Sequence, residues 1–169
     1  MNFFNLDPRQ LPTSTLYRIQ YDGCMTIFNP HSGFASRDTK TFYTQRDGIF
    51  VDFGGAVESH LSWDKDRPSF FISLFADKRH AENWALSWSA RHDDKMCEIF
   101  KINASSLVGL SVFHAEELWR CLCLHVPEAA EASIADEYLV ARRIPYSAVL
   151  GRWTTEDVKR GGGYSSRDR

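Results

Sequence analysis

The sequence predicts an α+β domain, and three observations lead to that fold class. Strand-like segments, recognised by alternation or by short apolar runs, occur along the whole chain, and segments with helical spacing separate them. The expected order is strand, long loop, short helix, strand, helix, strand, helix, strand, which suits an α+β domain better than a doubly wound parallel sheet. The chain of 169 residues is also long enough to bury one hydrophobic core.

Composition favours a soluble protein that stays inside the cell. Twenty basic and 22 acidic residues give a formal net charge of −2. They form no Lys/Arg stripe, so nucleic acid is not an expected partner. No apolar run approaches the ~20 residues that span a bilayer, and the N-terminus resembles neither a signal peptide nor a transit peptide. We therefore expect a cytoplasmic protein without a membrane segment, whose oligomeric state the sequence leaves open.

The four cysteines indicate neither a disulfide framework nor a metal site. They are Cys24, Cys97, Cys121 and Cys123, and no two of them form a CxxC pair. In a strand, Cys121, Cys123 and His125 would present three ligands on one face, but this segment has helical spacing, in which they diverge. We expect reduced thiols and no metal.

The first half of the chain contains one strand, a long loop and a short helix. The strand is expected at residues 16–21, where apolar and polar residues alternate before an Asp-Gly turn. Residues 29–55 are rich in Gly, Asp, Ser, Thr and Asn, which predicts a long loop with one short strand at 49–53. A loop of this length in a compact domain is typical of a binding loop or a lid. The short helix follows at residues 56–63.

The segment from Ser69 to Ala85, SFFISLFADKRHAENWA, joins a buried strand directly to a helix. Its first half, residues 70–75, is a dense apolar run with Ser73 inside it. Its second half begins at Asp77, a favourable N-cap residue, and continues at helical spacing. A hydroxyl inside an apolar strand needs a hydrogen-bond partner, because leaving it unpaired costs roughly 1–3 kcal/mol. That partner is either the neighbouring backbone or a ligand in a cleft.

The remaining elements are assigned by the same patterns. Strands are expected at residues 96–102, 112–113 and 136–144 and, after a turn, within 147–153. Residues 114–124 have helical spacing, and residues 127–133 are expected to form an Ala/Glu-rich loop. The polar residues from 154 to 169 have too few apolar side chains to pack, so we expect a single domain over residues 1–153 and a disordered tail.

Three polar residues lie within separate apolar strands or at their ends: Arg18, Ser73 and Glu137. The common phosphate-binding, hydrolase and zinc-protease signatures are absent. Each of the three residues has a plain structural explanation. Arg18 would be an exposed or edge-strand residue, Ser73 a core serine bonded to backbone, and Glu137 a solvated carboxylate beside Asp136.

In their order and spacing, these residues resemble the ADP-ribosyltransferase superfamily. Arg18 lies in LYR, Ser73 in FFIS before the helix with AENWA, and Glu137 in DEYLV before IP. The pattern is most similar to the Arg-Ser-Glu branch, which includes the cholera-toxin-like and pierisin-like enzymes. With HLSW and RRIP added, it is closest to a family of fungal domains of this layout. The resemblance covers Leu16 to about Trp153 and implies split mixed β-sheets with flanking helices around an NAD cleft.

The resemblance also implies NAD as a substrate and a role for each residue. Glu137 would stabilise the positive charge that builds on the ribose as nicotinamide leaves, as in glycoside cleavage. Arg18 would anchor the phosphates or the ribose, and Ser73 would hold the nicotinamide ribose and orient Glu137. Further side chains are expected to bind the cofactor: Tyr17, His60 and Phe75.

We therefore expect an NAD-dependent ADP-ribosyltransferase or NAD glycohydrolase, with water or another molecule, such as a protein, as acceptor. Two features differ from the family pattern. Leu74 and Phe75 follow Ser73 where members usually carry further hydroxyls, and Ala135 stands two residues before Glu137, where arginine-modifying members carry Glu or Gln. These differences support an alternative, a catalytically degenerate domain of the same fold that binds a protein. An RNA 2′-phosphotransferase of the superfamily would need basic clustering, which this chain lacks.

Overall fold

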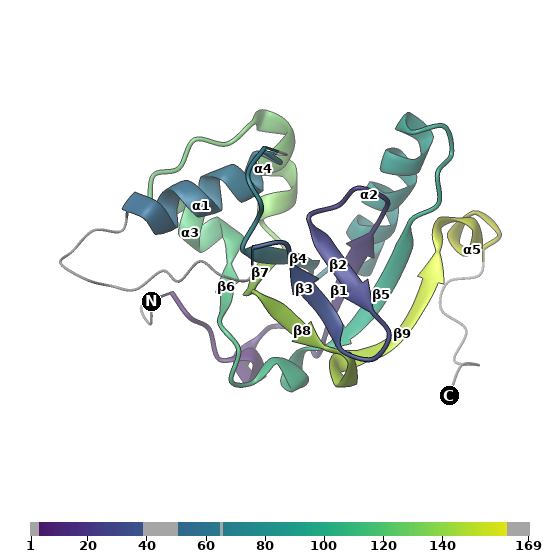
Figure 1. The fold of residues 1–169 in the computed structure, drawn as a ribbon, viewed down its shortest axis with the longest axis horizontal. Coiled ribbons are helices and arrows are strands. Elements are labelled where there is room, and N and C mark those ends of the chain that lie inside the picture. The colour runs from purple at the N-terminus through teal and green to yellow at the C-terminus, as the bar shows by residue number, and fades with distance from the viewer. Residues whose placement is uncertain (1–3, 39–50, 65, 162–169) are drawn as a thin grey trace.

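The computed structural model describes residues 4–38, 51–64 and 66–161, whose strands form two sheets (Figure 1). The larger sheet contains, from edge to edge, β6 (Val112–His114), β7 (Glu137–Ala141), β4 (Phe71–Phe75), β1 (Thr15–Gln20), β5 (Glu98–Asn103) and β9 (Val149–Thr154). The smaller sheet contains β2 (Thr26–Asn29), β3 (Gly33–Ser36) and β8 (Arg143–Pro145). The expected α+β class is confirmed, but the sheets, expected to be mixed, pair in antiparallel fashion throughout the described residues.

Helices cover one face of the larger sheet in two groups (Figure 1). The group over β6, β7 and β4 consists of α1 (Val51–Leu61), α3 (Ala115–Cys121) and α4 (Glu128–Ile134). The group over β1, β5 and β9 consists of α2 (Lys78–Arg91) and α5 (Thr155–Lys159). Short 3-10 helices lie in the connections: η1 (Pro8–Gln10), η2 (Ala104–Leu107) and η3 (Tyr146–Ala148). None of the described helices has the length and apolar character that crossing a bilayer requires.

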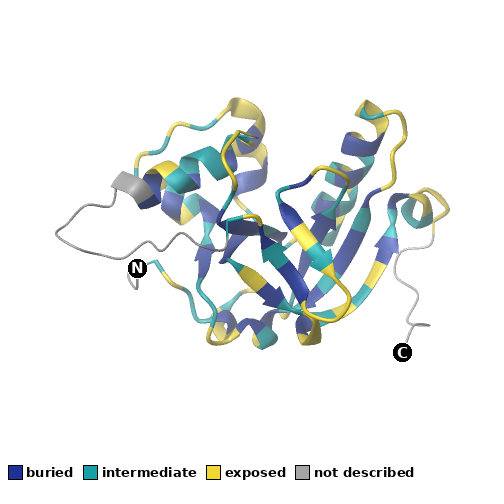
Figure 2. Ribbon diagram, in the orientation of Figure 1, coloured by how far each residue is buried: buried dark blue, intermediate teal, exposed yellow. Residues whose placement is uncertain are grey.

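Strand alternation divides the core between the two faces of the larger sheet, whose strands are mostly buried (Figure 2). On β4, Ile72 and Leu74 pack toward the smaller sheet, and Phe71 packs under the first group of helices. Because successive side chains point to opposite faces, Ser73 lies on the helical face with Phe71 and Phe75. The strand that the sequence predicts is therefore apolar on both faces except at one hydroxyl.

The larger sheet is weakest between β1 and β4. One residue pair, Tyr17 opposite Phe75, joins these two strands, whereas β1 pairs with β5 along its whole length. Beyond Phe75 the chain enters α2, whose N-cap residue Asp77 accepts a hydrogen bond from the backbone nitrogen of His80 at 2.9 Å. The predicted junction of strand and helix is thus confirmed, and it lies beside the place where the sheet divides.

The long loop predicted over residues 29–55 is wrong where the structure describes it. β2 and β3 form a hairpin there, because Phe28 and Phe34 pack against Phe100 of the larger sheet, with ring centroids 4.6 and 4.9 Å from it. The short strand predicted at 49–53 is also wrong over residues 51–53, which begin α1. The rest of the predicted loop, residues 39–50, lies outside the described residues.

Two further corrections concern residues 127–144. Residues 127–133, predicted as a loop, form α4, because Ala130, Ser133 and Ile134 recur at helical spacing on its buried side. The strand predicted at 136–144 divides into β7 and β8, which belong to different sheets. The division occurs at Arg142, whose φ of 69° turns the chain out of the larger sheet.

The predicted polar tail is wrong in its first part. Thr154 caps α5 through a capping box with Asp157, and Val158 packs against the cluster under α2. A short segment with one apolar residue is ordered here because the cap satisfies its first backbone donors and α2 provides a surface. Residues 162–169 lie outside the described residues.

Gly33 lies where β3 closely approaches β8, and its substitution tests how tightly the two strands pack. Its φ is +93°, and a Cβ atom there would clash with the carbonyl oxygen of Ile144 and lie 2.5 Å from the backbone nitrogen of Tyr146. Gly33→Ala is therefore expected to lower the free energy of unfolding by about 3 kcal/mol, from backbone strain and overpacking together. Urea denaturation measures this loss.

The matched control is Gly109→Ala. Gly109 has a similar φ of +87°, but nothing lies within 4 Å of its added Cβ. Its substitution should lower the free energy of unfolding by only about 1 kcal/mol, because alanine is unfavourable in the left-handed conformation. Equal losses for the two variants would show that the backbone of β8 accommodates a Cβ at position 33 without cost.

Candidate functional site

A cleft opens where β1 and β4 divide, and residues from both groups of helices line it. The free space inside it is about 100 Å3, which is smaller than the about 300–1,000 Å3 of most small-molecule pockets. Its polar lining includes Arg18, His60, Ser73, Ser133 and Glu137. Its aromatic lining consists of Tyr21, Trp63, Phe75 and Trp84.

Arg18 is a buried cation whose guanidinium has a donor without a hydrogen-bond partner among the described residues. Only 7% of the residue is exposed, and its Nη1 donates to the backbone carbonyl of Ser73 at 3.2 Å. Its buried Nε has no hydrogen-bond partner among the described residues, and no described carboxylate forms an ion pair with it. An unpaired donor on a buried charge is costly, so Arg18 is suited to an oxygen-rich or anionic ligand in the cleft. The alternative that Arg18 is an exposed or edge-strand residue is wrong, because the residue is buried and β1 lies inside the sheet.

Ser73 and Glu137 come together through the register of β4 and β7. Phe75 lies opposite Glu137 and Ser73 lies opposite Leu139, so Ser73 and Glu137 are diagonal neighbours on one face. The Ser73 hydroxyl is close enough to the Glu137 carboxyl to lower its pKa by hydrogen bonding. Glu137 is 8% exposed, so the interpretation of this residue as a solvated carboxylate is wrong.

His60 links Ser73 to a second serine. Its Nε2 lies 2.7 Å from the Ser73 hydroxyl and 4.0 Å from Glu137 Oε1, and its Nδ1 lies 2.6 Å from the Ser69 hydroxyl. Burial, and then the nearby Arg18 charge, lower the pKa of His60 to about 3. The imidazole is therefore neutral at physiological pH, with one nitrogen donating and the other accepting.

Burial raises the pKa of Glu137 to about 7. The Ser73 hydrogen bond and the Arg18 charge oppose this rise, and the neighbouring Asp136 adds to it. The cause is the cost of a carboxylate charge in a poorly solvated site, which the cationic Arg18 offsets only in part. A carboxylate that titrates near neutrality within a cleft is typical of functional sites.

The proton on Glu137 sets the direction of a chain of hydrogen bonds. When Glu137 is protonated, it can donate to Ser73, Ser73 to His60, His60 to Ser69, and Ser69 to the carbonyl of Phe71, 3.3 Å away. When Glu137 is ionised, Ser73 donates to the carboxylate, and the His60 nitrogens exchange donor and acceptor roles. Each hydroxyl has one proton to give, so the members of the chain must change together.

Aromatic side chains give the cleft flat apolar surfaces. Tyr21 packs against Trp84 with ring centroids 5.6 Å apart, and Trp63 is 47% exposed at the end of α1. Phe75, which the sequence predicts for this site, lines the cleft as well. Tyr21, Trp63 and Trp84 were not predicted, although Trp84 lies in the AENWA segment of the motif and Trp63 ends HLSW.

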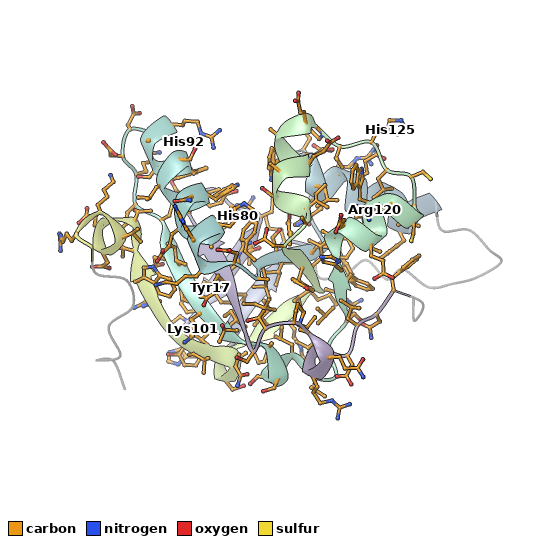
Figure 3. All side chains as sticks on the ribbon, turned by 180° about the vertical axis from the view of Figure 1, so that it is seen from behind. Tyr17, His80, His92, Lys101, Arg120 and His125 are labelled. Atoms are coloured by element: carbon orange, nitrogen blue, oxygen red, sulfur yellow. The ribbon has the colours of Figure 1, made fainter. Side chains whose placement is uncertain are left out.

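Of the residues predicted to bind a cofactor, Tyr17 lies elsewhere. Its ring packs against Trp153 at 6.1 Å and its hydroxyl lies 3.3 Å from Thr15 (Figure 3). Helix α2 contacts β1 on this face, so Tyr17 is part of the apolar cluster under α2 and does not line the cleft. Tyr17 is thus not an aromatic face of the cleft; Tyr21, four residues later, lines the cleft instead.

The two departures from the family pattern have different structural settings. Leu74 is fully buried on the opposite face of β4, so no hydroxyl at this position would reach the cleft. Ala135 is exposed between α4 and β7, and its carbonyl lies 3.0 Å from His114 Nε2. The Ser73–Glu137 pair is thus intact, whereas a carboxylate at position 135 is missing.

Comparisons with known proteins agree with this architecture. A family model described as "Domain of unknown function (DUF7587)" matches residues 11–158. Fourteen chains of solved structures match, among them EcPltA, with a TM-score of 0.56 and 13% identity over 85% of this chain and 76% of that one. At this identity the similarity shows the fold, which is ADP-ribosyltransferase-like. No curated protein sequence matches.

Proposed function

We propose that this chain, which belongs to the family described as "Domain of unknown function (DUF7587)", binds NAD in its cleft and cleaves the bond between nicotinamide and ribose. The ADP-ribose then passes to water or to another acceptor, so the chain is an NAD glycohydrolase or an ADP-ribosyltransferase of the Arg-Ser-Glu branch. The observation that carries the proposal is the convergence of buried Arg18, half-buried Ser73 and buried Glu137 on one cleft.

Glu137 carries the chemical step. As the bond from ribose C1′ to the nicotinamide nitrogen breaks, its electron pair leaves with neutral nicotinamide and positive charge develops on the ribose. An ionised Glu137 accepts a hydrogen bond from the ribose 2′-hydroxyl and stabilises this charge, more strongly in the transition state than in bound NAD. Ser73 donates to the carboxylate and orients it, while neutral His60 holds Ser73.

Arg18 binds the anionic part of the substrate. Its planar guanidinium has an unpaired Nε and lies within reach of the Ser73 backbone, so a phosphate or ribose oxygen would satisfy the missing hydrogen bond. The aromatic surfaces of Tyr21, Trp84 and Phe75 suit the flat rings at the two ends of NAD. No metal has a part in this proposal.

The test measures NAD binding and nicotinamide release on the same preparation of the full chain. Calorimetry reports binding, and chromatography follows free nicotinamide over time. Release well above that from NAD alone supports the proposal. Binding without release supports the alternative, a catalytically degenerate domain. Ala135 and the missing hydroxyls after Ser73 favour that alternative. A stable protein partner recovered without NAD consumption would favour that alternative further.

Arg18→Met is expected to weaken NAD binding by about 10- to 100-fold, because charge-assisted hydrogen bonds contribute about 1.5–3 kcal/mol. The folded protein should lose little stability, since methionine replaces a buried charge whose Nε has no described partner. Calorimetry and thermal unfolding measure the two effects.

The control for Arg18 is Arg79→Met, which removes an exposed arginine from α2. It should bind NAD as the wild-type protein does. Unchanged affinity in Arg18→Met would exclude Arg18 from the binding site, and a large loss of stability would show that its main role is structural.

A further inference from the structure

A second row of polar side chains reaches the cleft at Ser133, and the proposed cleavage of NAD does not use it. Ser133 belongs to the last turn of α4 and lines the cleft together with Glu137. Its hydroxyl lies 3.4 Å from His80 Nε2, and His80 Nδ1 lies 2.6 Å from Asp136 Oδ1. His80 lies in the first turn of α2, on the side toward α4 (Figure 3). The Ser133 hydroxyl, the His80 imidazole and the Asp136 carboxylate thus form a row of successive contacts.

The hydrogen bonds around Asp136 determine the orientation of His80. The Oδ2 atom of Asp136 accepts a hydrogen bond from the backbone nitrogen of Asp77 at 3.1 Å, which fixes the carboxylate. An ionised carboxylate only accepts hydrogen bonds, so Nδ1 of His80 must be the donor to Oδ1. In the neutral imidazole the lone pair is then on Nε2, the atom that faces Ser133. The Phe75 ring, 5.0 Å from the imidazole, packs against it.

This arrangement matches the requirements for an activated hydroxyl. A nucleophilic serine needs a base within hydrogen-bond reach, and the base needs a third group that orients it; the first contact is often looser before substrate binds. His80 supplies the base and Asp136 the orienting carboxylate. Ser133 is 6% exposed, and its face toward solvent is the cleft in which Glu137 lies.

We propose that Ser133 is the acceptor of ADP-ribose, so that the protein modifies itself inside its own cleft. This inference rests on the proposed function. The bond from ribose C1′ to nicotinamide breaks with its electron pair going to nicotinamide, and a bond forms from Ser133 Oγ to C1′. The Oγ proton passes to His80 Nε2, and Asp136 stabilises the imidazolium.

Two features favour an internal acceptor. Position 135 is occupied by alanine, which cannot help to deprotonate an external acceptor, whereas His80 can deprotonate Ser133. A hydroxyl held beside the reacting ribose also has a large advantage in effective concentration over a molecule that must first bind. The product would occupy the cleft covalently, which limits each protein molecule to few turnovers.

The test incubates the full chain with NAD and measures nicotinamide release, the intact mass and the modified residue by peptide mapping. One ADP-ribosyl group on Ser133 is expected. Nicotinamide release without an adduct on Ser133 overturns this inference and leaves the proposed function standing. Absence of any nicotinamide release overturns both. The mapping uses wild-type protein, so its result does not depend on a variant that folds.

Variants then test the role of each group. Ser133→Ala should carry no adduct, and an adduct that persists there on another residue contradicts the assignment. His80→Gln should form the adduct about 100-fold more slowly, the usual effect of losing a general base. Ser87→Ala, which removes an exposed serine of α2, is the control and should be modified like wild type. An unchanged rate in a folded His80→Gln protein would show that His80 is only structural.

Discussion

Glu137→Gln is expected to lower the rate of nicotinamide release by about 10²- to 10³-fold, the size of effect seen when one group that stabilises transition-state charge is removed. Glutamine has the same shape and can still bond to Ser73, but it carries no negative charge to oppose the charge on the ribose. NAD affinity should change much less, because the lost interaction develops in the transition state. Rates and binding constants measured on the same protein separate the two effects.

The matched control for this experiment is Glu131→Gln. Glu131 is an exposed carboxylate of α4, six residues before Glu137, and its replacement should leave nicotinamide release at the wild-type rate. Thermal unfolding of both variants shows whether the fold is retained. A folded Glu137→Gln protein that still releases nicotinamide at the wild-type rate would remove Glu137 from the mechanism.

The same substitution is expected to change how stability depends on pH. The pKa of Glu137 is raised from 4.5 to about 7 in the folded protein, so between these values the native state holds a proton that the unfolded state has lost. Stability from this group is complete below pH 4.5 and disappears as pH rises through about 7. The loss amounts to about 3 kcal/mol, from 1.36 kcal/mol for each unit of pKa difference.

Urea denaturation at pH 5 and pH 8 measures this effect as a difference between proteins. Glu137→Gln should gain up to about 3 kcal/mol relative to wild type on going from pH 5 to pH 8. His60, whose pKa is lowered to about 3, makes a contribution of opposite sign that is present in both proteins. The exposed Glu131→Gln variant again serves as control. A difference that does not change with pH would show that Glu137 titrates at its ordinary value.

The strands and helices that depend on local patterns were predictable from the sequence. β4 and α2 follow from an apolar run and from a cap at Asp77, and both signals lie within a few residues of the elements that they specify. The hairpin of β2 and β3 was missed, because it is held by contacts of Phe28 and Phe34 with Phe100, far away in the sequence. Tertiary packing of this kind outweighs local composition.

The candidate site was predictable where a polar residue interrupts an apolar strand. Ser73 and Glu137 stand out for this reason, and the register of β4 and β7 then brings them together. Ser133 was not predictable, since it lies in a segment whose helix was missed. His80 and Asp136 looked like ordinary polar residues of a helix start and a strand start. Their alignment with Ser133 depends on how α2 and α4 pack over the sheet.

Arg18, Ser73 and Glu137 come from β1, β4 and β7, each of which has a neighbouring strand on both sides. β1 pairs along its whole length with β5, and β4 with β7, so each side of the cleft base is held by a well-paired strand even though β1 and β4 share one residue pair. The residues at the rim, such as Trp63, come from connections without this restraint. Changes at the rim can therefore alter what enters the cleft while Arg18, Ser73 and Glu137 keep their geometry.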